Sequence, residues 1–237
     1  GEAAHASEPA EPEFAPAEKP YGAVAVCAGE GMAELFRELG VDRIVTGGQT
    51  MNPSTEDILN EVNRTPAETV FVFPNNKNIQ MAAEQCIPLT EKKVVVIPTK
   101  TVPQGITAMM NVDFDAPDAQ AITDAMTGCL SSVTTAQITY AARNSDFDGF
   151  AINEGDYLAL LDGKLFGTER DITSLLTRLA ALAAEREAAF VTLFYGEGVS
   201  QEEAEAAQAL FTEACPETEV SLLSGGQPVY YYTISIE

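Results

Sequence analysis

Residues 46–55 read TGGQTMNPST and stand between an apolar run, 43–45, and an amphipathic run, 56–62. This order predicts the end of a strand, a glycine turn and the capped start of a helix. Two glycines admit positive φ angles, and either Asn52 or Ser54 can cap the helix. Free N–H groups at such a helix start attract anions or carbonyl oxygens. The alternative is that the stretch is only a tight strand-to-helix turn.

The same succession of strand, turn and helix recurs through the first half of the chain. Apolar strands are predicted at 23–27, 43–45, 69–73 and 94–97, and amphipathic helical patterns lie between them. Short apolar strands that alternate with amphipathic helices indicate a parallel sheet covered on both faces.

The second half begins with a different pattern. A helix at about 118–130 is followed by alternating segments at 134–142 and 147–164, whose Asn-Glu-Gly and Asp-Gly turns indicate antiparallel strands. Helices and strands then alternate to the end of the chain. We therefore predict an α/β fold of two subdomains, a parallel-sheet β-α-β subdomain at 21–117 and a mixed-sheet α/β subdomain at 118–237.

Residues 1–20 differ in composition from the rest, being rich in Ala, Glu and Pro. Such a segment buries too little apolar surface to offset the entropy lost on ordering, so we predict a disordered interdomain linker. A linker at the start, together with Gly in place of Met at position 1, predicts a further domain upstream.

Two glycine motifs occur in both halves. One order of elements occurs at 23–49 and again at 190–227: a strand, Gly-Glu-Gly, a helix, a strand and Gly-Gly-Gln. This echo indicates two subdomains of related design, and chance recurrence of glycine turns is the alternative. Only the first Gly-Gly-Gln leads into a helix start. The second, followed by Pro228, is predicted to be a structural turn.

The turns after the predicted parallel strands are the candidate binding edge, because ligands bind outside the carboxyl ends of such strands. These turns offer amides, hydroxyls, a carboxylate and two ammonium groups, which suit a polar group or a protein loop. The alternative is a set of structural caps and turns. The candidate residues are Glu30, Gly47, Gly48, Gln49, Thr50, Asn52, Ser54, Asn75, Asn76, Lys77, Thr99 and Lys100.

The charge of the chain excludes several partners. It has 36 acidic and 13 basic residues, a formal net charge of −23, which repels nucleic acid and anionic lipid surfaces. No apolar stretch reaches the roughly 18 residues that a membrane span needs. The only histidine, His5, lies in the predicted linker, so histidine-based metal sites and catalytic triads have no histidine in the globular part.

The remaining chemical motifs favour no catalytic or metal site. The chain contains four scattered cysteines, Cys27, Cys86, Cys129 and Cys215. They form no C-x-x-C pair and indicate reduced core thiols of a cytoplasmic protein. Neither G-x-G-x-x-G nor G-x-x-x-x-G-K-[ST] occurs, so a nucleotide site of either kind is not expected. Asp113, Asp115 and Asp118 favour a solvated acidic loop over a Mg²⁺ site.

A series of motifs resembles the C-terminal region of the bacterial fatty acid kinase A protein, whose family is related to dihydroxyacetone kinases. The resemblance covers about residues 21–237. The motifs are AGEG at 28–31, GGQTMNPST at 47–55, PNNKNI at 74–79, VIPTKTVPQG at 96–105, ITYAAR at 138–143, YGEG at 195–198 and GGQPVYYYTISIE at 225–237. The chain departs from the family pattern at Thr46, where Glu is frequent, and at Cys27, where a small residue is usual.

The resemblance implies a fold similar to DegV proteins and to the K component of dihydroxyacetone kinase. It also implies a role: this domain docks a DegV-like carrier whose bound fatty acid is phosphorylated, for phospholipid synthesis, by an upstream ATP-binding kinase domain of the same chain. ATP and metal are expected only in upstream domains. No cofactor and no kinase activity are expected of this fragment alone.

Two other functions stay open. The same edge, or the cleft between the subdomains, is a candidate site for a fatty acid or a phosphorylated small molecule. Alternatively, the fragment is a structural domain that forms a homodimer. A cytoplasmic location is expected under all three hypotheses.

Overall fold

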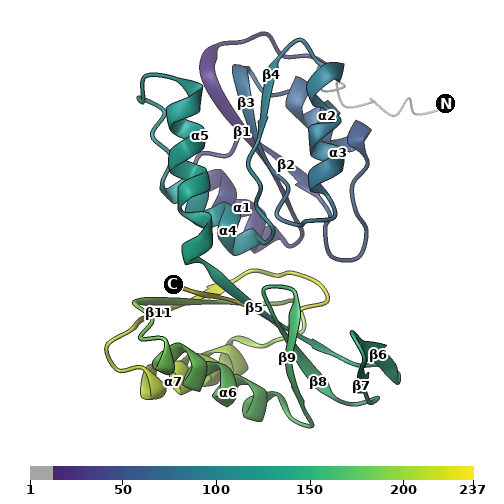
Figure 1. Cartoon of the computed structure of the whole chain (residues 1–237), viewed down its shortest axis with the longest axis vertical. Coiled ribbons are helices and arrows are strands. Elements are labelled where there is room, and N and C mark those ends of the chain that lie inside the picture. Colours follow the sequence, from purple (N-terminus) through teal and green to yellow (C-terminus); the bar gives the residue numbers. More distant parts are fainter. Residues whose placement is uncertain (1–12) are drawn as a thin grey trace, which may run out of the picture.

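The computed structural model describes residues 13–237, which form two α/β units stacked one on the other (Figure 1). The first unit contains a four-stranded sheet in the order β2-β1-β3-β4, and all its neighbouring strands are parallel. Its strands are β1 (Lys19–Cys27), β2 (Arg43–Thr46), β3 (Ala67–Phe73) and β4 (Lys93–Val96). The parallel sheet predicted from the apolar runs is confirmed.

Helices cover both faces of this sheet, because neighbouring residues along its buried strands face opposite sides. On one face, Ala23, Ala25 and Phe71 pack with α1 (Glu30–Glu38), α4 (Val102–Met110) and α5 (Ala119–Gly128). On the other, Val24 and Val26 pack with α2 (Thr55–Asn63) and α3 (Gln80–Glu84). Short 3₁₀ turns, η1 (Ile87–Leu89) and η2 (Leu130–Ser132), follow α3 and α5.

The second unit contains a mixed six-stranded sheet in the order β11-β10-β12-β5-β8-β9. Its strands are β5 (Thr134–Tyr140), β8 (Tyr157–Leu161), β9 (Lys164–Glu169), β10 (Phe190–Tyr195), β11 (Glu219–Ser224) and β12 (Tyr232–Ile236). Only β10 and β11 pair in parallel. A separate hairpin consists of β6 (Ser145–Phe147) and β7 (Phe150–Ile152).

One face of the second sheet is apolar and the other turns toward the first unit. Ile138, Leu193 and Ile234 are fully buried against α6 (Ile172–Glu185) and α7 (Gln201–Ala214). These helices lie on the far side of the second sheet, so its opposite face meets the first unit (Figure 1).

The boundary between the units lies later in the chain than residue 117. Ile122 and Met126 of α5 are buried in the core of the first unit, together with Leu130 of η2. The first unit therefore continues to about residue 133, just before β5 begins at Thr134. The sequence pattern missed this because an amphipathic helix shows that it has a buried face but not which sheet it covers.

The linker predicted at 1–20 extends too far. The amide of Ala15 donates a hydrogen bond to Asn63 O at 2.7 Å, and that of Glu18 donates to Pro66 O at 3.0 Å. β1 begins at Lys19, opposite Ala67 of β3. Backbone pairing of this kind needs no apolar side chains, so composition alone did not reveal it. Residues 1–12 of the predicted linker lie outside the described residues.

The sequence echo corresponds to two parallel β-α-β units. β1, α1 and β2 form one, and β10, α7 and β11 form the other. The glycine motifs of the two repeats contact each other. Gly29-Glu30-Gly31 of the first repeat lies against Ser224–Gln227 of the second.

This contact joins the two units through backbone atoms. The Met32 amide donates a hydrogen bond to Gly225 O at 3.1 Å. Gly29 has φ +103°, and a Cβ there would lie 2.6 Å from Gly225 O. A Cβ on Gly31 would overlap the carbonyl oxygen of Ser224. Only glycine allows the start of α1 to approach the end of β11 this closely.

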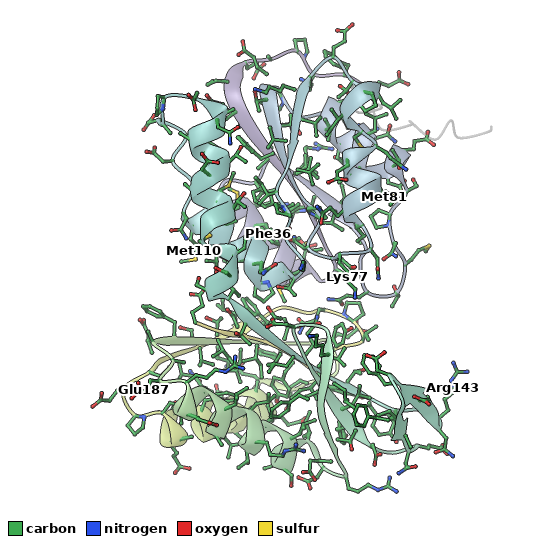
Figure 2. All side chains as sticks on the ribbon, in the orientation of Figure 1. Phe36, Lys77, Met81, Met110, Arg143 and Glu187 are labelled. Atoms are coloured by element: carbon green, nitrogen blue, oxygen red, sulfur yellow. The ribbon has the colours of Figure 1, made fainter. Side chains whose placement is uncertain are left out.

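The outer surface of the first unit carries several exposed methionines, in contrast to Phe36, which is fully buried in its core. Met81 and Met110 lie on opposite sides of this unit, and Lys77 lies near the junction of the units (Figure 2). No helix within residues 13–237 has the length and apolar character needed to cross a bilayer.

Gly31→Ala is expected to lower the free energy of unfolding by about 1–3 kcal/mol, because the added methyl group forces the two backbones apart. Urea denaturation followed by circular dichroism measures the change. Gly128→Ala is the matched control, since a Cβ at Gly128 meets no atom within 4 Å. Equal stability of the Gly31→Ala and wild-type proteins would contradict the tight contact.

Candidate functional site

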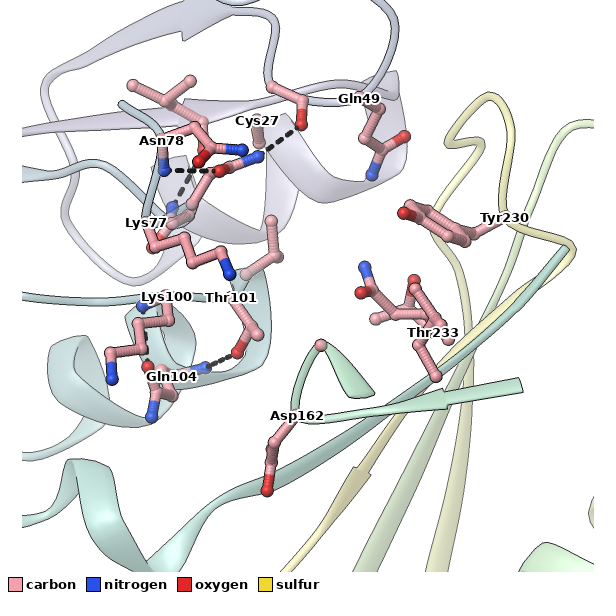
Figure 3. A pocket seen from close by; sticks show the side chains of 18 of the residues that line it. Cys27, Gln49, Lys77, Asn78, Lys100, Thr101, Gln104, Asp162, Tyr230 and Thr233 are labelled. Carbon is pink, nitrogen blue, oxygen red and sulfur yellow. Dashed lines mark hydrogen bonds between the residues drawn. The ribbon is translucent and has the colours of Figure 1, made fainter. Parts of the chain in front are cut away.

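A pocket of about 540 Å³ lies between the two units, at the carboxyl edge of the parallel sheet. The first unit contributes its strand-end loops, and the second contributes the sheet face that its own helices leave uncovered. The lining residues are Val26, Cys27, Ala28, Gly47, Gly48, Gln49, Asn75, Asn76, Lys77, Asn78, Lys100, Thr101, Val102, Gln104, Leu130, Ser131, Val133, Gln137, Phe147, Leu160, Asp162, Gly163, Tyr230 and Thr233. Figure 3 shows this pocket from close by.

The Gly47-Gly48 turn brings the backbone to the pocket wall. Gly47 and Gly48 have φ angles of +148° and +101°, which side chains disfavour. The Gly48 amide donates to Met51 O at 2.9 Å and closes the turn. Ser54, one of the two caps predicted, then caps α2 in a capping box with Asp57. Gln49 is thereby held at the rim of the pocket.

Asn75 ties three strand ends together. Its amide N–H donates to Thr99 Oγ1 at 3.0 Å, and its side-chain Nδ2 donates to Val26 O at 2.8 Å. The residue has φ +57°, a left-handed conformation that Asn tolerates better than most residues. A Cβ on Gly105 would overlap Asn75 Oδ1, so glycine is required on α4 as well.

The next residue of this loop fixes the neighbouring turn. Asn76 Nδ2 donates to Gly48 O at 2.9 Å, and Asn76 Oδ1 accepts from the Asn78 amide at 2.9 Å. Lys77, exposed between them, therefore projects from a loop that is anchored on both sides. The two motifs GGQ and PNNKN form one continuous wall.

The start of α4 forms another part of the wall. Thr101 caps this helix by accepting from the Gln104 amide at 3.3 Å. Gln104 Oε1 accepts from the Lys100 amide at 2.7 Å, and Gln104 Nε2 donates to Leu130 O at 3.1 Å. Thr101 Oγ1 lies 2.8 Å from Thr135 Oγ1 of β5, a direct contact between the units.

Positive charge is concentrated on one side of the pocket. Lys77 and Lys100 lie together on the wall formed by the first unit, opposite Asp162 and Thr233 of the second unit (Figure 3). Within residues 13–237, neither ammonium group makes an ion pair. In a chain of net charge −23, two lysines without a carboxylate partner make this wall attractive to an anion.

Nucleophilic chemistry is not supported by the pocket's thiol. Burial raises the pKa of Cys27 to about 12, and the nearby Arg37 guanidinium offsets only part of that rise. The thiol is therefore protonated at neutral pH, and the thiolate is the reactive form. Among residues 13–237, no group of three or more His, Cys, Asp or Glu side chains is placed to hold a metal ion.

The pocket brings together seven of the twelve residues predicted from the sequence: Gly47, Gly48, Gln49, Asn75, Asn76, Lys77 and Lys100. The other five lie elsewhere. Glu30 is exposed and pairs with Arg37 at 3.0 Å, while Thr50 and Asn52 are exposed on the turn. Ser54 is a helix cap, and Thr99 is fully buried beneath Asn75.

The wall formed by the second unit was missed by the sequence reasoning. It includes Gln137 of β5, Asp162 in the β8–β9 turn, and Tyr230 and Thr233 near the end of the chain. The sequence pattern predicted strands in this part of the chain but not which of their faces meets the first unit. A signal was available in the hydroxyl and amide residues on one face of these strands, where a sheet covered on both sides would normally be apolar.

A family model for the C-terminal domain of fatty acid kinase A-like (FakA-like) proteins matches residues 22–237. Protein YloV of Bacillus subtilis is 42% identical over 231 residues, covering 98% of this chain and 42% of YloV. An uncharacterized protein of Staphylococcus aureus is 34% identical over 214 residues, covering 90% of this chain and 39% of that protein. The chain thus spans about two fifths of the length of these relatives.

Solved structures share the fold at low sequence identity. A DegV family protein from Corynebacterium glutamicum has a TM-score of 0.66 at 15% identity, covering 92% of this chain and 96% of that one. The Streptococcus pneumoniae fatty acid kinase B3 protein, loaded with linoleic acid, has a TM-score of 0.59 at 9% identity, covering 92% and 99%. Dihydroxyacetone kinase from C. freundii has a TM-score of 0.58 at 12% identity, covering 91% and 48%. The expected DegV and dihydroxyacetone kinase fold is confirmed.

Asn75→Ala is expected to lower the free energy of unfolding by about 1–3 kcal/mol, because Val26 O loses its buried donor. The positive φ of Asn75 adds strain for alanine. Urea denaturation measures the effect, with Asn78→Ala as the control, since Asn78 is exposed on the same loop. If Asn75→Ala lowers the free energy of unfolding no more than Asn78→Ala does, the role given to Asn75 is refuted.

Proposed function

The chain belongs to the family of FakA-like C-terminal domains of fatty acid kinases, and we propose that it docks a DegV-like fatty-acid carrier for that kinase. The observation that carries the proposal is the family match over residues 22–237 in relatives more than twice as long. The catalytic steps belong, in this proposal, to an upstream domain that binds ATP and metal. The carrier would have the fold of the fatty acid kinase B3 protein, which is loaded with linoleic acid in its own structure.

The surface that supports docking lies beside the pocket, on the two linked loops of the first unit. Met51 and Met81 are 77% and 69% exposed. Met51 follows the GGQ turn and Met81 follows the PNNKN loop, and the Asn76–Gly48 hydrogen bond joins these segments. Exposed methionines adapt to the shape of a partner, and grouped exposed apolar side chains mark interaction surfaces.

Lys77 adds a charge to this docking rim, which we define as Met51, Lys77 and Met81. Its ammonium group has no carboxylate partner within residues 13–237. A carrier that presents an apolar patch flanked by a carboxylate would complement the rim. Such complementarity raises the association rate and fixes orientation more than it raises affinity.

The double variant Met51→Ser/Met81→Ser is expected to weaken carrier binding by about tenfold or more, since each lost apolar contact costs roughly 1 kcal/mol or more. Isothermal titration calorimetry with a fatty-acid-loaded DegV-like protein from the same organism gives the affinity. Met110→Ser is the matched control, because Met110 is 68% exposed on the opposite side of the unit (Figure 2).

Two outcomes would count against docking at this rim. If the folded wild-type chain binds no carrier, the docking role fails. If it binds and the double variant binds as tightly as Met110→Ser, the carrier contacts another surface. Light scattering of the chain alone, run in parallel, tests the alternative of a structural dimerisation domain.

The purified chain is expected to show no turnover of ATP, with or without the loaded carrier, because it contains no phosphate-loop motif. Release of inorganic phosphate or ADP in a coupled assay measures this. The prediction fails if turnover is found and is lost in the Lys77→Met/Lys100→Met variant, which removes both ammonium groups of the pocket. Turnover that this variant retains would indicate a contaminating enzyme.

A further inference from the structure

We propose that the pocket between the units binds a small phosphate monoester that carries hydroxyl groups. The proposal differs from carrier docking, since it concerns a small ligand bound by the chain alone, and Lys77 is the one residue that the two proposals share. It rests on unsatisfied polar atoms, on the two lysines, and on the shape of the floor.

The first observation is Thr233, which is 1% exposed and has no hydrogen-bond partner for its Oγ1 within residues 13–237. Its strand, β12, lies between β10 and β5, and its side chain lines the pocket (Figure 3). A buried hydroxyl without a partner costs stability. A ligand hydroxyl or phosphate oxygen at this position would satisfy it.

One further lining side chain shares this feature. Gln49 Oε1 is buried and makes no hydrogen bond with any other described residue. It is an acceptor, so its complement is a donor such as a hydroxyl group. Two unsatisfied polar atoms at one pocket point to a ligand with several hydrogen-bonding groups rather than to a bare apolar molecule.

The second observation is the division of charge across the pocket. Lys77 and Lys100 line it from the first unit, and Asp162 lines it from the second. The side chain of Lys77 extends toward the second unit, whereas that of Lys100 turns away from it (Figure 3). The Asp162 carboxylate already accepts from the Thr135 amide at 2.9 Å and repels a further negative charge. The geometry therefore orients the ligand, with its phosphate at the lysines and its hydroxyl groups toward Thr233 and Asp162.

The third observation concerns the floor. Behind Gln137 and Thr233, the residues that point the other way from β5 and β12 are Ile138, Tyr232 and Ile234, each at most 2% exposed. They are packed against α6 and α7, so the apolar core closes the pocket rather than extending it into a tunnel. The pocket of about 540 Å³ is closed on this side, and Gln137 and Thr233 place polar groups on its floor, which disfavours an acyl chain that lies against them.

Calorimetry and thermal unfolding of the whole chain test the proposal with named probes. Ribose 5-phosphate and glycerol 2-phosphate are expected to bind and to raise the melting temperature. Three control compounds should each bind at least about tenfold more weakly than these esters. Glycerol lacks the anion, and inorganic phosphate lacks the hydroxyl-bearing carbon chain. Octanoate carries an anion on an acyl chain.

Two sets of variants connect binding to these residues. Thr233→Val keeps the shape of the side chain and should leave the unliganded protein at least as stable as the wild type. It should weaken the binding of the phosphate esters by about fivefold or more. The double variant Lys77→Met/Lys100→Met should weaken the binding of the esters further and make that binding less dependent on salt concentration. Lys93→Met is the matched control, because Lys93 is an exposed lysine on β4 that does not line the pocket.

The outcomes are decisive in either direction. Absence of binding by both esters at 10 mM, a probe concentration at which even weak sites fill, overturns the proposal. Octanoate or inorganic phosphate binding as tightly as the esters overturns the ligand class. If Thr233→Val does not fold, the lysine double variant decides. Unchanged binding of the esters by that variant overturns the assignment of the pocket as their site. Carrier affinity measured on Thr233→Val separates the two proposals, since docking at the outer rim predicts no change.

Discussion

The structure depends on a close backbone contact between the start of α1 and the end of β11. Met32 donates to Gly225 O, and the approach requires glycine at positions 29 and 31 because a Cβ would meet backbone oxygen. This contact places the carboxyl edge of a parallel sheet over the uncovered face of a mixed sheet. The Thr101–Thr135 contact and the burial of Phe194 of β10 in the core of the first unit also join the two units, so the pocket has a wall from each.

The loop wall of the pocket depends in turn on Asn75, which bonds to Val26 of β1 and to Thr99 after β4. Parallel strands end at one edge, and each end leaves backbone groups to satisfy. Asn75 meets this need with one side chain and its own amide, and Asn76 extends the linkage to Gly48. The first unit therefore presents a braced surface, on which Lys77 and Lys100 make no ion pair with another residue of the described range 13–237.

The sequence predicted those features that are local in the chain. The apolar strands, the Ser54 cap and the grouping of the GGQ and PNNKN turns follow from side-chain period and turn chemistry. The placement of α5 in the first core and of Glu30 outside the pocket did not follow. Both depend on how the layers of the two units meet, and a pattern read along one chain segment does not encode its neighbour in space.

The two faces of β5 and β12 show why the pocket is better understood as a binding surface than as an unfinished core. Toward the helices these strands present Ile138 and Ile234, whereas toward the first unit they present Gln137 and Thr233. Apolar residues at the second pair of positions would stabilise the junction by burying more apolar area. Polar residues instead leave Thr233 Oγ1 unsatisfied, at a cost in stability. The same pocket is lined by two lysines that make no ion pair within residues 13–237. A ligand that supplied the missing hydrogen bonds would recover this cost, and such a relation between instability and binding is expected at functional sites.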